Sequence, residues 1–206
     1  HDRGPIVLCL DTSGSMRGAP EKIAKAVVIA ALQVARETGR ACRLVAFGGP
    51  GELVEHDFHH SAGGLQTLMQ VMDQSFDGGT DIQTPIDRAI ATVKSQGWRS
   101  ADVLIVSDGE FGCVPQTLEV LDEARATLGL RVQGVLVGDR ETMGLLEVCD
   151  HIHWEREWRR FAGSAYGVDT RHFSPVHSRS LTALYFPNAL SARAARHHNG
   201  AGGSKR

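Results

Sequence analysis

"IVLCLDTSGS", residues 6–15, joins an unbroken apolar run to a cluster of polar side chains. An apolar run of this length predicts a strand buried on both faces, as in a parallel sheet. The strand then gives way to one carboxylate and several hydroxyls, with Asp11, Ser13 and Ser15 at alternating positions. Because ligands of open α/β sheets bind at the carboxyl ends of the strands, this stretch is also a candidate site.

The rest of the chain alternates apolar strands with amphipathic helices. Further buried strands are predicted at 42–47, 102–109 and 130–138, and a last edge strand at 150–154. Helices are predicted at 20–38, 64–76, 115–128 and from 139 onward. Another helix is predicted to start near Thr84, with Thr84 as its N-cap. The Gly-Pro-Gly turn before "ELVEHDF" (52–58) is too short for a parallel crossover, so this segment should return antiparallel. The pattern predicts an α/β fold: a doubly wound, mostly parallel sheet with one antiparallel edge strand and helices on both faces.

Composition narrows the class of protein. The 206 residues are 42% hydrophobic and 22% charged, which predicts one domain, 1–162, followed by an irregular and partly disordered C-terminal extension, 163–206. An apolar segment of the extension, 181–190, is a candidate for docking on the domain or on a partner. Because the chain starts at His1, we expect it to be a fragment of a longer protein.

Charge, hydropathy and cysteine usage bear on the binding partners and the cellular compartment of the protein. A net charge of −2 gives no signal for nucleic-acid binding. No segment is long and apolar enough to predict a membrane span. The four cysteines lack C-x-x-C spacing, so we expect reduced thiols and a cytoplasmic or otherwise intracellular protein.

Three polar clusters are predicted to meet at the carboxyl ends of the strands. They are Asp11-x-Ser13-x-Ser15, the loop Gly78-Gly79-Thr80-Asp81, and Ser107-Asp108-Gly109 after the strand "VLIV". They converge if the strands that end at Leu10 and Val106 are neighbours. The donors are oxygens only, which favours a hard cation such as Mg²⁺, with Mn²⁺ or Ca²⁺ as alternatives, and disfavours Zn²⁺.

This pattern resembles the metal-ion-dependent adhesion site of von Willebrand factor A (VWA) domains, D-x-S-x-S with a distant Thr and Asp. The resemblance covers roughly residues 5–160 and implies the Rossmann-like VWA fold. It implies that Ser13, Ser15 and Thr80 contact the metal through hydroxyls, while Asp11 and Asp108 act largely through water or hydroxyl groups. It also implies an open coordination position that takes an Asp or Glu from a protein partner.

Within the VWA group, the segments "FDGGTD", "ADVLIVSDGEF", "DHIHW" and "REWRRF" are most similar to intracellular proteins of the ViaA and CoxE-like kind. That resemblance implies a MoxR-type AAA+ ATPase, or its client, as partner, and a role as adaptor or co-chaperone. Asp81, Glu110 and Phe111 are candidate rim residues for the partner, although a solvated loop explains Glu110 and Phe111 equally well.

The sequence disfavours two other classes of function, an enzyme and an extracellular adhesion domain. A Mg²⁺-dependent hydrolase or phosphotransfer enzyme is disfavoured because the sequence has no phosphate loop, no G-x-S-x-G elbow and no evident base for Ser13. We therefore expect a binding module without catalytic residues. An extracellular adhesion domain is disfavoured by the unpaired cysteines.

Overall fold

Six strands form a single sheet in the computed structural model, which describes residues 4–58, 64–138 and 142–155. The sheet order is β3-β2-β1-β4-β5-β6. All neighbouring strands are parallel except β2 and β3, which are antiparallel. The predicted fold class is confirmed, and the bounds of the strands are β1 (Ile6–Asp11), β2 (Cys42–Phe47), β3 (Leu53–Phe58), β4 (Asp102–Ser107), β5 (Arg131–Val137) and β6 (His151–Glu155).

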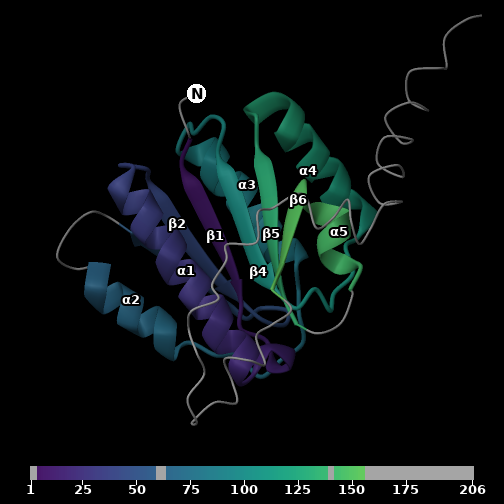
Figure 1. Ribbon diagram of the computed structural model, residues 1–206. Helices are drawn as coiled ribbons and strands as arrows, with labels where there is room; N and C mark the ends of the chain where they lie inside the picture. The colour runs from purple at the N-terminus through teal and green to yellow at the C-terminus, as the bar shows by residue number, and fades with distance from the viewer. Residues whose placement is uncertain (1–3, 59–63, 139–141, 156–206) are drawn as a thin grey trace, which may run out of the picture.

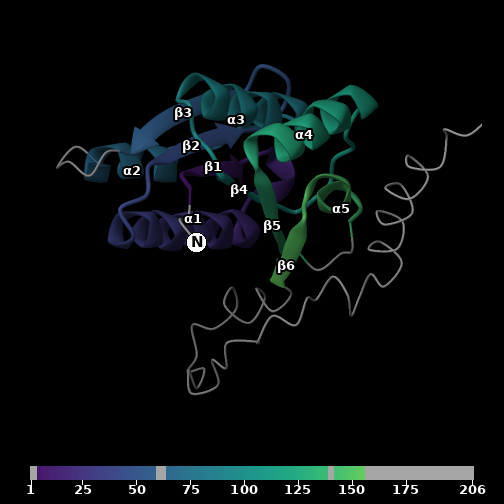
Figure 2. The same ribbon diagram turned by 90° about the horizontal axis from the view of Figure 1, so that it is seen from above.

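The helices lie on both faces of this sheet (Figures 1 and 2). Successive side chains of a strand point to opposite faces, and β1 supplies both cores. Leu8 and Leu10 belong to the core under α1 and α2, whereas Val7 and Cys9 belong to the core under α3, α4 and α5. The helices are α1 (Ala19–Glu37), α2 (Gly64–Asp73), α3 (Gln83–Ser95), α4 (Pro115–Leu128) and α5 (Gly144–Val148).

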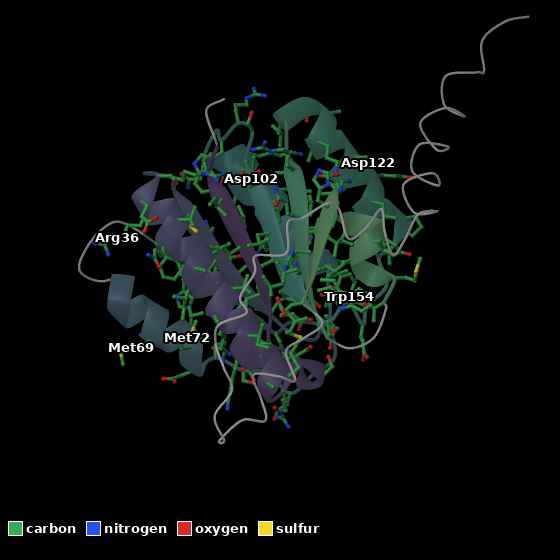
Figure 3. The ribbon with its side chains drawn as sticks, viewed as in Figure 1. Arg36, Met69, Met72, Asp102, Asp122 and Trp154 are labelled. Carbon is green, nitrogen blue, oxygen red and sulfur yellow. The ribbon has the colours of Figure 1, made fainter. Side chains whose placement is uncertain are left out.

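The central strand β1 brings the predicted site together. All six of its residues are buried, and Leu10 pairs with Ala46 of β2 on one side and with Val106 of β4 on the other. The carboxyl ends of β1, β2 and β4 therefore meet at one edge of the sheet, at the lower end of the strands in Figure 1. The side-chain view shows Asp102, at the start of β4, at the opposite end (Figure 3).

The start of α3 differs from the sequence-based expectation. Thr84 is not the N-cap, because the helix already begins at Gln83. Instead, the Asp81 carboxylate accepts hydrogen bonds from the Gln83 backbone N–H at 3.0 Å and from the Thr84 hydroxyl at 2.6 Å. A carboxylate outcompetes a hydroxyl for free N–H groups at a helix start, since the N-terminal end of a helix favours negative charge.

The described residues bear on some of the other expectations and not on all. The predicted domain boundary at 162 and the extension 163–206, including the segment 181–190, lie outside the described residues. Cys9, Cys42 and Cys113 are free thiols, and Cys9, Cys42 and Cys149 are buried. None of the described helices is long and apolar enough to cross a membrane.

Candidate metal centre at the strand ends

Three hydroxyls predicted to act together lie in contact. The Ser13 and Ser15 hydroxyl oxygens are 3.2 Å apart, and the Thr80 hydroxyl donates to Ser13 Oγ at 3.0 Å. Ser13 is buried, Thr80 half-buried and Ser15 exposed, so the cluster runs from the interior to the surface. Residues 67 positions apart in the sequence thus form one group of oxygen donors.

Backbone hydrogen bonds hold the Thr80 loop in this place. The Phe76 N–H donates to the Thr12 carbonyl at 2.8 Å, and the Gly14 N–H donates to the Gly78 carbonyl at 3.1 Å. After Thr80, the Asp81 N–H donates to the Gly48 carbonyl at 2.7 Å. The loop is therefore tied to the segment after β1 on one side and to the turn after β2 on the other.

Asp11 is a buried carboxylate at the end of β1. Its Oδ1 accepts the Ser13 backbone N–H at 2.9 Å, and its Oδ2 accepts the Ser107 hydroxyl at 2.5 Å. Burial raises the pKa of Asp11 from 3.8 to about 6; the hydrogen bonds from Ser107 and Ser13 oppose this rise, and the negative charge of Asp108 adds to it. Among the described residues, no Lys, Arg or His forms an ion pair with this carboxylate.

Asp108 occupies the neighbouring loop. Its Oδ1 accepts the Glu110 backbone N–H at 3.0 Å, and its carbonyl accepts the Thr142 hydroxyl at 2.8 Å. The negative charge of Asp108 contributes to the raised pKa of Asp11, so the two carboxylates repel each other. Within the described part of the chain, no hydrogen bond joins the Asp108 carboxylate to the three hydroxyls.

The candidate rim residues have different surroundings. The Asp81 carboxylate is engaged at the start of α3, as described above. Glu110 is exposed, whereas Phe111 is half-buried and packs against the core. Their contact with a partner stays a prediction.

The sequence places Ser107 in the third polar cluster without a role of its own, and it does not single out Thr142. Ser107 donates to Asp11 and accepts the Gly109 N–H at 3.0 Å, so it links the ends of β1 and β4. Its position one residue after Val106, which pairs with Leu10, was an available signal. Thr142, which binds the Asp108 carbonyl, lies in an irregular segment without a comparable signal.

The donors present fit a hard divalent cation. They are hydroxyls and carboxylates, and the described residues contain no group of three or more His, Cys, Asp and Glu side chains that could hold a metal by themselves. The negative charge of Asp11 is buried without a cationic side chain beside it, so a divalent cation would offset its desolvation cost. The largely neutral donor set argues against a zinc site, which requires Cys, His or several carboxylates.

A hollow elsewhere on the molecule has different chemistry. It has a volume of about 560 Å³ and lies between α1 and the strands β4 and β5, with Val27, Val34 and Leu104 in its lining. Asp102 and Arg131, at the starts of their strands, also line it, so it lies toward the opposite edge of the sheet from the hydroxyl cluster.

Comparison with known proteins settles the family. A family model described as "von Willebrand factor type A domain" matches residues 6–110, which include Asp11, Thr80 and Asp108. The chain belongs to the von Willebrand factor type A family. Of the curated relatives, the VWA chain is 30% identical over 151 residues to "Regulatory protein ViaA" of Proteus mirabilis (strain HI4320). The match covers 73% of this chain but only 30% of that relative.

Solved structures confirm the fold. A "von Willebrand factor type A" structure from Catenulispora acidiphila is 18% identical, covering 78% of this chain and 40% of the other, with a TM-score of 0.56. Proximal thread matrix protein 1 from the mussel byssus is 11% identical, covering 78% of this chain and 45% of the other, with a TM-score of 0.55. At these identities the similarity concerns the VWA fold alone.

Proposed function

We propose that this VWA domain is a metal-dependent protein-interaction module. In this proposal Mg²⁺ is held by the hydroxyls of Ser13, Ser15 and Thr80, with Asp11 and Asp108 acting largely through water or hydroxyl groups. Mn²⁺ or Ca²⁺ could replace Mg²⁺. The observation that supports the proposal is the convergence of three hydroxyls beside a buried carboxylate that has no cationic partner among the described residues.

The chemistry of the donors suits recognition of an acidic partner. Hydroxyls are neutral, so they leave most of the charge of a divalent cation uncompensated. When bound, the cation supplies a strong electrostatic attraction for an incoming carboxylate, and such a contact at the centre of an interface can dominate the binding energy. The residues of this chain orient the donors: β1 fixes Asp11 and Ser13, and the tied loop fixes Thr80.

The similarity to a regulatory protein supports a protein as the partner. We infer that the partner is a MoxR-type AAA+ ATPase or its client, and that the domain acts inside the cell as an adaptor or co-chaperone. Because the chain spans under a third of that relative, these inferences concern the whole protein and rest on the family resemblance.

A hydrolytic function is less well supported by the geometry. A nucleophilic serine needs a base within hydrogen-bond reach of its hydroxyl. The Ser13 hydroxyl lies in contact with the hydroxyls of Ser15 and Thr80 and also interacts with the buried Asp11 carboxylate, whose Oδ1 accepts the Ser13 backbone N–H. No histidine is among these contacts of Ser13 in the described residues, so they do not form the Ser–His pair that commonly activates a serine.

The first test is a calorimetric titration of EDTA-treated protein with Mg²⁺. We expect one binding site, lost in the Ser13→Ala, Asp108→Ala double variant and kept in the control variant Ser95→Ala, whose hydroxyl binds a carbonyl at the end of α3. Unchanged affinity in the double variant would exclude this site.

The second test concerns the partner. Surface plasmon resonance against the co-purified ATPase should show binding in Mg²⁺ that is lost in EDTA and in Asp11→Ala. Equal affinity under all three conditions would contradict metal-dependent docking. The segment 181–190 or the hollow beside α1 would then be the surface to examine.

A further inference from the structure

We propose that Glu52, in the turn between β2 and β3, is a positioning residue that holds the Thr80 loop in the geometry of the candidate site. The part of this proposal that concerns the metal rests on the proposed function. The part that concerns the loop stands on contacts in the structure alone.

The Glu52 side chain folds back over its own turn. Its Oε2 accepts the Gly49 N–H at 2.8 Å. The turn is closed by two further hydrogen bonds of 3.0 Å each, from the Gly48 N–H to the Glu52 carbonyl and from the Glu52 N–H to the Gly49 carbonyl. The carboxylate is thereby fixed at the end of a rigid turn and not at the end of a free side chain.

From this position the carboxylate packs directly on the Thr80 loop. A Cβ added to Gly78 would lie 2.4 Å from Glu52 Oε2 and 3.0 Å from its Cδ. Real Cβ atoms essentially never come as close as the first of these distances, so the carboxylate occupies the space that a side chain at position 78 would need. Gly78 is thus a second place where the two loops meet, beside the hydrogen bond from the Asp81 N–H to the Gly48 carbonyl.

The contact lies between the two ties of the loop. The Gly78 carbonyl accepts the Gly14 N–H, and Asp81 donates to the Gly48 carbonyl at the far side of Thr80. Glu52 therefore braces the segment 78–81 from the same turn that provides the second tie. The half-buried carboxylate has no Lys, Arg or His partner among the described residues, so ion pairing does not explain its place.

Adjacent glycines provide a matched pair for a test. Neither Gly78 nor Gly79 has a positive φ, so neither backbone conformation requires glycine. A Cβ on Gly79 meets nothing within 4 Å, whereas one on Gly78 meets the Glu52 carboxylate. Gly78→Ala should therefore displace the carboxylate, and Gly79→Ala should not.

The experiment compares Glu52→Ala, Gly78→Ala, their double variant, Glu52→Gln and Gly79→Ala. The first readout is amide hydrogen exchange of Asp81 and Gly14 in EDTA, which does not depend on any metal. We expect faster exchange, by about five- to tenfold, in Glu52→Ala and in Gly78→Ala, since each loses one net hydrogen bond and its packing. The exchange rate in Gly79→Ala should match that of the wild type. The rate in Glu52→Gln should be close to that of the wild type, because the glutamine amide oxygen can accept the Gly49 N–H.

Coupling distinguishes a shared contact from two separate defects. The double variant should exchange no faster than either single variant, because both remove the same contact. Multiplied effects in the double variant, or unchanged exchange in Glu52→Ala, would overturn the proposal. If Glu52→Ala fails to fold, Gly78→Ala decides, since it displaces the carboxylate without removing it.

The second readout is Mg²⁺ affinity by calorimetry. We expect Glu52→Ala and Gly78→Ala to weaken it by a factor similar to the change in exchange. Faster exchange with unchanged affinity would contradict the link between Glu52 and the site. If the wild type binds no Mg²⁺, the proposed function fails, while the exchange data still judge the bracing of the loop.

Discussion

Replacing Asp11 by asparagine is expected to stabilise the protein in EDTA at neutral pH. The Asp11 carboxyl is fully buried, and its pKa is raised from 3.8 to about 6. A raised pKa means that the folded state binds the proton more tightly than the unfolded state. The contribution of Asp11 to stability is therefore most favourable at low pH, becomes less favourable by about 3 kcal/mol as the pH rises from about 4 to 6, and is constant above that.

Asparagine removes the charge and keeps the shape. Its amide oxygen can accept the Ser13 N–H and its NH₂ group can donate to Ser107 Oγ, at a cost of about 1 kcal/mol for less favourable hydrogen bonds. We expect Asp11→Asn to be more stable than the wild type by about 2 kcal/mol at about pH 7.5, and this advantage to shrink by about 2 kcal/mol at about pH 4.5.

Urea unfolding followed by far-UV circular dichroism, with EDTA at both pH values, measures this difference. Titrating groups that do not interact with Asp11 cancel between variant and wild type, whereas Asp108, whose charge acts on Asp11, is part of the measured difference. Asp102→Asn is a control with the opposite expected sign. Asp102 forms ion pairs with Arg40 and Arg131, so neutralising it should lower the stability of the protein. A stability difference between Asp11→Asn and wild type that is the same at both pH values would refute the reasoning.

Three further predictions concern the scaffold. EDTA should leave the far-UV dichroism unchanged at room temperature, because the two apolar cores supply most of the stability; loss of the signal would contradict this. Leu8→Ala, at a fully buried position of β1, should lower the free energy of unfolding by about 2–5 kcal/mol in urea titrations, and a loss below about 1 kcal/mol would show that the core collapses around the gap. Gly109→Ala should lower the melting temperature more than Gly112→Ala. Gly109 has a φ of +71°, and an added Cβ would lie 2.3 Å from Thr142 Oγ1, whereas a Cβ on Gly112 meets nothing within 4 Å. Equal melting temperatures of the two variants would count against this contact.

The strand arrangement could be predicted because it depends on local patterns. Continuous apolar runs mark buried parallel strands, and the short Gly-Pro-Gly turn forces an antiparallel partner. Once the strands that end at Leu10 and Val106 are taken as neighbours, the hydroxyls of Ser13 and Thr80 are expected at one edge. The structure places them in contact.

Details that depend on loop conformation could not be predicted. Thr84 was expected as the N-cap of α3, and only the observed helix start at Gln83 shows that the Asp81 carboxylate accepts the Gln83 N–H and the Thr84 hydroxyl. The contact between Glu52 and Gly78 depends on how two turns pack, which no periodicity encodes. The same holds for the hydrogen bond from Thr142 to the Asp108 carbonyl.

The candidate site draws on segments far apart in the chain: residues 11–15, the loop at 80 and the loop at 108. During synthesis, Asp11 and Ser13 emerge early, but Asp11 meets Ser107 only after β4 has inserted beside β1. A ligand that requires all three segments cannot recognise a nascent or partly unfolded chain. Such a ligand binds the native state alone. At a free ligand concentration of about 100 times its dissociation constant, it adds about 2.7 kcal/mol to the free energy of unfolding. The topology thus makes occupancy of this corner depend on the pairing of β4 with β1.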